Sequence, residues 1–291
     1  MSPARTVPDP GQVPDVGGET PVPSRAGRNL PAAIGVGLGL GALVVIPLYT
    51  VRWVFAVVVA VVLGVAIVEI CRALRTAGLR PTLLPLVVGG PLMILAAYLR
   101  GSDALIFGLV ATSLACVVWR IPDGGQGVLR DITSSVFVAT YVPFLAGFAT
   151  LLTDQPHGAA RVTAFIATTV CSDVGGYAAG VVFGKHPMAP SVSPKKSWEG
   201  FAGSALACVV AGVALVSTFV DISWWQGVLY GIAVVVTATV GDLGESMLKR
   251  DIGIKDMGHI LPGHGGIMDR LDSLLLVAPV AWLLLSWWAP S

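Results

Sequence analysis

Charge is the scarcest property of this chain, because only 12% of its 291 residues are Asp, Glu, Lys or Arg. Hydrophobic residues make up 55%, and the mean hydropathy of +0.81 is far above that of water-soluble proteins. The net charge of +1 leaves no excess of cations, so bulk charge gives no sign of a nucleic-acid partner. These shortages exclude a soluble globular protein and favour a polytopic membrane protein.

Side chains that form disulfides or zinc sites are also few. The four cysteines lie in or beside apolar runs without a C-x-x-C pair, which indicates small buried hydrophobes rather than a disulfide framework. His259 and His264 share one loop, but no cysteine or third histidine stands at ligand spacing. The sequence therefore argues against a structural zinc site.

Nine apolar runs approach the length of about 20 residues that a helix needs to cross a bilayer. They are too uniformly apolar for barrel strands, which alternate. We expect an all-α integral membrane protein, with a polytopic bundle of about nine transmembrane helices forming a single catalytic domain over residues 30–291. Residues 1–29 are rich in Pro and Gly and predict a disordered cytoplasmic tail, with no cleavable signal peptide. The expected spans are 31–49, 53–70, 83–99, 104–119, 133–152, 162–183, 201–220, 224–240 and 271–288.

The distribution of Lys and Arg orients these spans. With the N-terminus in the cytoplasm, all but three of the 18 cations fall in inside segments, and only Arg52, Arg100 and Arg161 face outside. The positive-inside rule therefore predicts a cytoplasmic N-terminus and an outside C-terminus. It also predicts that the charged motifs described next face the cytoplasm from the cell membrane.

One segment concentrates the charge that the rest of the chain lacks. Residues 241–273 hold five Asp, one Glu, two Lys, two Arg and two His. Because charge beside a bilayer is costly, this concentration indicates a site for a charged ligand. Carboxylates, cations and glycines together suit metal ions and phosphate groups. Asp269 and Asp272 are spaced i,i+3, so both project to one side of a helix.

Further polar residues interrupt apolar runs elsewhere. Asp173 lies midway along a span, where a carboxylate must be paired, protonated or metal-bound, although a structural hydrogen bond between helices is an equal alternative. Lys195 and Lys196 precede an apolar helix that Ser197 could cap, which is a suitable phosphate pocket; ordinary positive-inside charge is the simpler reading. Glu69 ends a span and is expected to pair with Arg72 or to snorkel.

The charged segment resembles the phosphatidate cytidylyltransferases, also called CDP-diacylglycerol synthases. The family signature is matched without departure over 27 residues, and the SPKKSWEG block is similar to the family's, with Ser197 where Thr is common. The match leaves the 1–29 tail unexplained. The residues that carry it are Ser246, Leu248, Lys249, Arg250, Lys255, Asp256, Gly258, Leu261, Pro262, His264, Gly265, Gly266, Ile267, Asp269, Arg270, Leu271 and Asp272.

The resemblance implies a membrane enzyme that converts CTP and phosphatidic acid to CDP-diacylglycerol and pyrophosphate in phospholipid biosynthesis. It also implies a homodimer and a pair of metal ions, Mg²⁺ with a second monovalent or divalent ion. We expect Asp242 and Asp269 as the main Mg²⁺ ligands, helped by Asp173 and Asp272. Catalytic roles fall to Asp242, Asp269, Lys196 and Lys249. Substrate binding falls to Ser193, Lys195, Ser197, Ser246, Arg250, His264, Gly265, Gly266 and Arg270.

Other functions remain open from the residues alone. An ion- or proton-coupled transporter would use an intramembrane acid such as Asp173, but we detect no internal repeat and the charge gathers at one interface. The lipid substrate could instead be an isoprenoid-ether or polyprenyl phosphate, since apolar spans do not specify acyl chains. The sequence lacks the spaced Asp motif of a CDP-alcohol phosphotransferase, which makes that enzyme class less favoured. A purely structural protein would not need so many clustered acids.

Overall fold

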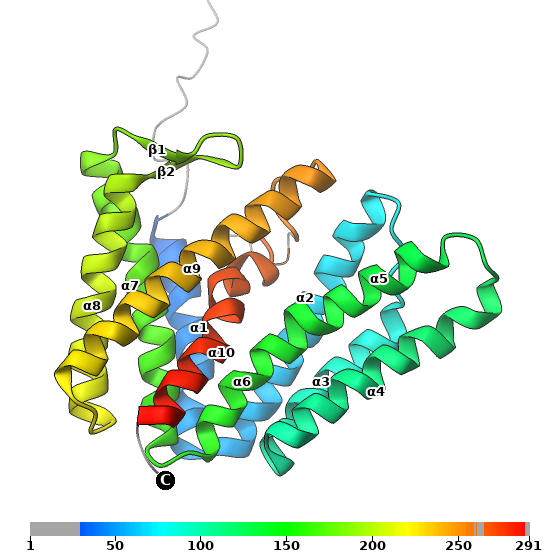
Figure 1. The fold of residues 1–291 in the computed structure, drawn as a ribbon, viewed down its shortest axis with the longest axis horizontal. Coiled ribbons are helices and arrows are strands. Elements are labelled where there is room, and N and C mark those ends of the chain that lie inside the picture. The colour runs from blue at the N-terminus through cyan, green and yellow to red at the C-terminus, as the bar shows by residue number, and fades with distance from the viewer. Residues whose placement is uncertain (1–29, 259, 261–264, 289–291) are drawn as a thin grey trace, which may run out of the picture.

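The computed structural model describes residues 30–258, 260 and 265–288, so the predictions for the 1–29 tail and for His264 lie outside it. The described chain is a bundle of long helices with one small β-hairpin (Figure 1). The elements are α1 (Leu30–Thr50), α2 (Arg52–Thr76), α3 (Leu83–Arg100), α4 (Ser102–Arg120), α5 (Val128–Ala139), α6 (Leu145–Leu151), α7 (Gly158–Phe183), β1 (Pro187–Ala189), β2 (Ser193–Ser197), α8 (Trp198–Phe219), α9 (Trp224–Ile252) and α10 (Met268–Trp288).

The predicted all-α membrane architecture is confirmed. Within the described residues, eight helical segments are long and apolar enough to cross a membrane. Helix α1, with 21 residues, corresponds to the first expected span. Each expected span therefore has its helix, and the fourth, which looked short, becomes a segment of 22 residues over Ser102–Asp123.

The fifth span is irregular at its centre. A π-helical turn, Thr140–Phe144, separates α5 from α6 and contains Pro143. Proline has no N–H for the regular helical bond, so a widened turn is the local solution. The turn carries Tyr141, whose buried hydroxyl has no hydrogen-bond partner among the described residues. This part of the bundle faces the charged region described below.

Two predicted boundaries were wrong at the charged end of the bundle. Helix α9 does not end near residue 240 but continues to Ile252, where Gly253 in the left-handed region (φ 77°) stops it. Residues 187–197, which lie between two expected spans, form an antiparallel hairpin in which Pro187 pairs with Ser197 and Ala189 with Ser193. Both corrections place charged side chains on ordered elements.

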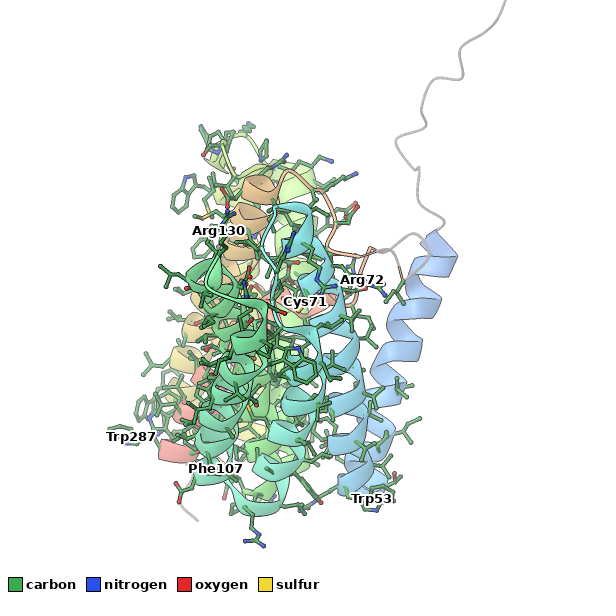
Figure 2. All side chains as sticks on the ribbon, turned by 90° about the vertical axis from the view of Figure 1, so that its right-hand side faces the viewer. Trp53, Cys71, Arg72, Phe107, Arg130 and Trp287 are labelled. Atoms are coloured by element: carbon green, nitrogen blue, oxygen red, sulfur yellow. The ribbon has the colours of Figure 1, made fainter. Side chains whose placement is uncertain are left out.

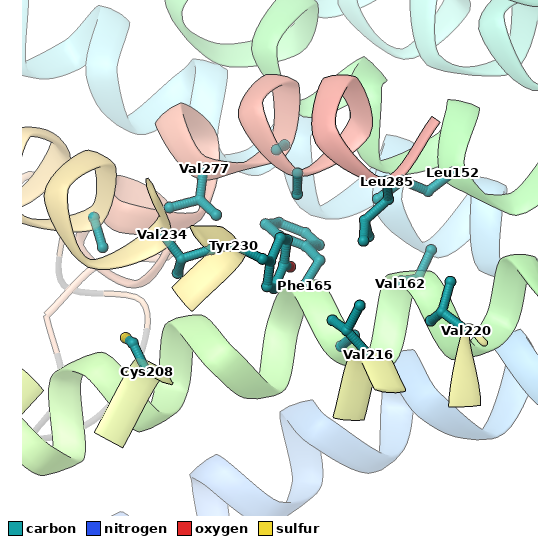
Figure 3. Packing of buried hydrophobic residues seen from close by; sticks show 14 of the residues in the cluster. Leu152, Val162, Phe165, Cys208, Val216, Val220, Tyr230, Val234, Val277 and Leu285 are labelled. Atoms are coloured by element: carbon teal, nitrogen blue, oxygen red, sulfur yellow. The ribbon is translucent and has the colours of Figure 1, made fainter. Parts of the chain in front are cut away.

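Helix α10 is the central element, because its faces contribute to apolar cores on either side. Phe165 of α7, Tyr230 of α9 and Val277 of α10 meet in one of these cores (Figure 3). Helices α7 and α8 approach each other through small residues: a Cβ added at Gly203 would lie 2.7 Å from the Gly175 carbonyl oxygen. The glycines around Asp173 thus allow α7 and α8 to pack closely.

The two ends of the bundle differ in chemistry. Arg72 and Arg130 lie toward the end that carries the hairpin, whereas Trp53, Phe107 and Trp287 lie toward the opposite end (Figure 2). The up-and-down order of the helices brings the connections α2–α3, α4–α5, α7–α8 and α9–α10 to the hairpin end (Figure 1). Within the described residues, the cations predicted to lie inside therefore share an end with the charged segment.

Candidate active site

A polar cavity of about 370 Å³ opens between α7, α8, α9, α10 and the hairpin. This volume is within the range of small-ligand sites, about 300–1,000 Å³. The four helices and the hairpin all contribute walls, so the cavity collects residues that are up to 100 positions apart in the sequence, from Ser172 to Asp272. The predicted site residues that line it are Asp173, Lys195, Lys196, Ser197, Asp242, Asp269, Arg270 and Asp272.

Asp242 is held on α9 by two partners from other elements. The Lys196 ammonium donates to Oδ2 at 2.5 Å, and the Ser273 hydroxyl donates to Oδ1 at 2.7 Å. The neighbouring Gly241 permits this geometry, because a Cβ there would lie 2.7 Å from the Asp272 carbonyl oxygen. The lack of a side chain at Gly241 thus brings the acids of α9 and α10 to one cavity.

Asp269 occupies the first turn of α10 and accepts hydrogen bonds from three residues. Its carboxylate accepts from the Lys249 ammonium at 2.9 Å and from the backbone N–H groups of Met257 and Gly266 at 3.0 and 2.7 Å. An acid at a helix N-terminus is also favoured by the helix dipole. The glycine backbone, expected to reach a substrate anion, here donates to a protein carboxylate instead, with Gly265 in the left-handed region (φ 78°).

A third group of acids lies behind these two. Glu245 has a fully buried side chain, and its only ion pair among the described residues is to Lys249 at 3.5 Å. The Glu245 carboxyl group lies within hydrogen-bond reach of the Asp272 carboxyl group, and Asp269 is also close enough to act on its charge. The i,i+4 spacing brings Glu245 and Lys249 together, and the burial of this pair follows from the continuation of α9 beyond residue 240. So many neighbouring carboxyl groups repel one another and favour bound cations or protons.

The hairpin supplies the cations opposite these acids. Lys195 and Lys196 lie on β2 and both line the cavity. Ser197 follows them as the N-cap of α8, where its Oγ accepts from the Gly200 N–H at 3.1 Å, as the sequence predicted. Ser193 begins β2 but is not among the residues that line the cavity.

Comparison with known proteins explains this combination of acids, cations and apolar helices. Residues 31–288 match the model of the cytidylyltransferase family. This chain belongs to that family. The match runs from α1 to α10 and leaves out the N-terminal tail.

Curated mycobacterial relatives extend over 90% of this chain. A protein of Mycobacterium leprae (strain TN) named phosphatidate cytidylyltransferase is 44% identical over 279 residues, covering 90% of this chain and 89% of its own length. Its namesake in Mycobacterium bovis is 42% identical over 278 residues, with 90% of each chain covered. One in Brucella suis biovar 1 is 32% identical over 198 residues, covering 68% of this chain and 70% of its own.

The donor set of this cytidylyltransferase family member fits a hard metal ion. In the part of the chain that the structure describes, no three His, Cys, Asp or Glu side chains form a ready-made cage. Magnesium does not need one, since it usually takes one or two carboxylates and completes its shell with water and substrate phosphates. Asp242 and Asp269 present such oxygens from two helices to one cavity that Asp173 and Asp272 also line.

Several predicted substrate-binding residues lie beside the polar cavity rather than in its walls. Ser246 is half-buried on α9, one turn from Asp242. Arg250 is exposed, and its Nε donates to the Val192 carbonyl oxygen in the hairpin turn at 3.3 Å. Gly265 and Gly266 contact Asp269 but do not line the cavity. The substrate roles of these four residues in this family member stay predictions.

Glu69 was misread from the sequence. It does not pair with Arg72 or snorkel: it is buried, with 2% of its surface exposed, and its Oε2 accepts from the Met268 N–H at 2.9 Å. A Cβ added at Gly258 or Gly266 would meet the Glu69 carboxyl group at 2.3 or 2.5 Å. Helix α2 thus supports the segment that holds Asp269. No local pattern indicates a contact across 199 positions.

Proposed function

We propose that this protein transfers the cytidylyl group of CTP to phosphatidic acid, forming CDP-diacylglycerol and pyrophosphate for phospholipid biosynthesis. One observation carries the proposal: Asp242 and Asp269 face the same cavity as Lys195, Lys196 and Arg270, at the end of a transmembrane bundle. The names of the mycobacterial and Brucella relatives support the same substrates.

The chemistry requires charge neutralisation more than proton transfer. A phosphate oxygen of phosphatidic acid attacks the α-phosphorus of CTP, a new P–O bond forms, and the bond to the β-phosphate breaks to release pyrophosphate. The attacking oxygen is already anionic and needs little help from a base. Bringing it against a triphosphate is the obstacle, and fixed cations that stabilise the leaving group lower that barrier.

Lys196 and Lys249 are suited to this task because each is now paired with an acid of the site. Lys196 donates to Asp242 and Lys249 to Asp269. Substrate phosphates would offer these ammonium groups a second anion within the reach of a flexible lysine side chain. Lys195 and Arg270 line the same cavity and add two further cations.

Mg²⁺ belongs to the proposal as the resident metal. Asp242 and Asp269 would hold it, with Asp173 and Asp272 as direct or indirect helpers, and a second ion, monovalent or divalent, would share the acidic cluster. When bound, the metal supplies Lewis-acid polarisation and neutralises phosphate charge. The buried Glu245 carboxyl group beside Asp272 adds another acid to this cluster.

The substrates meet at a membrane face. We propose that the protein lies in the cell membrane with the polar cavity toward the cytoplasm, because the cations gather at that end of the bundle. CTP would enter from the cytosol and phosphatidic acid from the inner leaflet. A homodimer, expected from the family resemblance, is part of the proposal and is tested by chemical crosslinking in native membranes.

The decisive experiment mixes the purified protein with CTP, phosphatidic acid and Mg²⁺ and measures lipid-linked CMP and pyrophosphate. Both products should appear in equal amounts and disappear with EDTA. A parallel arm with a polyprenyl phosphate tests the other lipid class. Solute counterflow in proteoliposomes without any CTP turnover would instead favour a transporter and overturn the proposal.

A further inference from the structure

We infer that a second, apolar cavity beneath the polar one binds part of one acyl chain of the lipid substrate. The inference rests on the proposed function and makes it more specific. The apolar cavity measures about 110 Å³ and lies between α1, α2, α6, α7 and α10. Its walls include Val62, Ala146, Ala149, Ile166, Leu271 and Ala278.

The two cavities share α7 and α10 in their walls. On α7, Asp173 lines the polar cavity and Ile166 the apolar one. They are seven residues apart, so they share a face of the helix and are separated by about 10 Å along its axis. On α10, Asp272 lines the polar cavity, while its neighbour Leu271 and the residue one turn further, Leu275, line the apolar one.

The chemistry of the apolar cavity restricts its ligand to hydrocarbon. Every residue that lines it is apolar, so it offers no partner to a phosphate, a sugar or a base. A cavity of this kind and size stays dry and accepts apolar molecules. Small residues leave the space: Ala146, Ala149 and Ala278 stand where larger side chains would fill it.

Its position then selects an acyl chain of the substrate over other hydrocarbon. A lipid phosphate near Asp272 or Asp173 would have its glycerol esters below the polar cavity, and its chains must pass into the bundle or into the bilayer. Lipid tails and apolar side chains are equally hydrophobic, so the cavity gains little by burial alone. Its effect is to fix where the chain runs, and thereby where the attacking phosphate sits.

The test fills the apolar cavity by substitution and varies the length of the acyl chains of the substrate. Ala149→Leu on α6 and Val62→Phe on α2 place larger side chains in two walls of the cavity and so reduce its volume. Ala115→Leu is a matched control at an exposed site on α4. The substrates are dihexadecanoyl and dihexanoyl phosphatidic acid at equal surface fraction in mixed micelles. Filling should lower kcat/KM for the long-chain substrate about tenfold, the effect of a steric mismatch in an apolar pocket.

Dihexanoyl phosphatidic acid, with chains too short to occupy the cavity fully, should be turned over at the wild-type rate by both variants, with an unchanged KM for CTP. That result also shows that the variants fold. Equal losses on both substrates, or no loss on either, would overturn the acyl-chain site. Failure of the wild-type protein to convert any phosphatidic acid would instead reject the proposed function, which separates the two outcomes.

Discussion

Asp269 combines two tasks in one carboxylate. It lines the polar cavity, and it also accepts the N–H groups of Met257 and Gly266 that shape the preceding segment. Asp269→Asn removes the negative charge but keeps one oxygen acceptor. We expect turnover to fall by at least about a hundredfold, as when a group that stabilises transition-state charge is lost. The measurement is CDP-diacylglycerol formation by purified protein with a normal thermal melt.

A matched substitution separates charge at the site from charge in general. Asp251→Asn changes an exposed acid near the end of α9, outside the cavity walls. This control should keep wild-type turnover. Near wild-type activity in Asp269→Asn would remove the metal-ligand role that we propose for that residue.

Glu69 supports the site from a distant helix. In Glu69→Ala, the Met268 N–H loses its hydrogen-bond acceptor. The segment around Gly258 and Gly266 also loses the side chain against which it packs. An unpaired buried donor costs about 1–3 kcal/mol, so the melting temperature and kcat should both fall. Glu69→Gln keeps an oxygen acceptor and should recover most of the loss. Hydrogen exchange at the Met268 amide gives a readout that activity alone cannot: it should be faster in Glu69→Ala.

At the scale of elements, the α7–α8 contact depends on the absence of side chains. A Cβ at Gly203 would meet the Ala179 Cβ at 2.3 Å and the Gly175 carbonyl oxygen at 2.7 Å. Gly203→Ala should therefore separate the helices, lower the melting temperature and disturb the cavity wall that Asp173 shares. Gly244→Ala, on α9 with open space around it, gains helix propensity of up to about 1 kcal/mol and should not be destabilised. Equal melting temperatures for the two variants would contradict this account of the interface.

The sequence predicted elements well where hydropathy decides them and poorly where other forces do. Apolar runs located every span. The extension of α9 to Ile252 was missed because Asp242, Glu245 and Lys249 lower the hydropathy, although they face protein rather than lipid. The hairpin was missed because Ser193–Ser197 is short and carries two lysines, which are poor strand formers.

At the scale of the whole molecule, part of the site could likewise be predicted from the sequence and part could not. The resemblance to the family predicted that Asp173, Asp242, Asp269 and Asp272 act together, and the polar cavity brings all four to its walls. The contribution of α2 through Glu69, and the closeness of Tyr141 to Glu245, join segments that are more than 100 positions apart. Such contacts come from the packing of the bundle, and no local pattern encodes them.

The orientation of the whole molecule leads to the last prediction. Lys185, between α7 and β1, and Asp103, in the first turn of α4, are both exposed and lie at opposite ends of the bundle. The positive-inside rule places Lys185 in the cytoplasm. A membrane-impermeant maleimide added to intact cells should label Asp103→Cys and spare Lys185→Cys, and inside-out vesicles should reverse the pattern. The wild-type protein should give a low background of labelling, because three of its four cysteines are buried. Labelling of Lys185→Cys in intact cells would mean that the polar cavity faces away from cytosolic CTP. That orientation would contradict the proposed reaction.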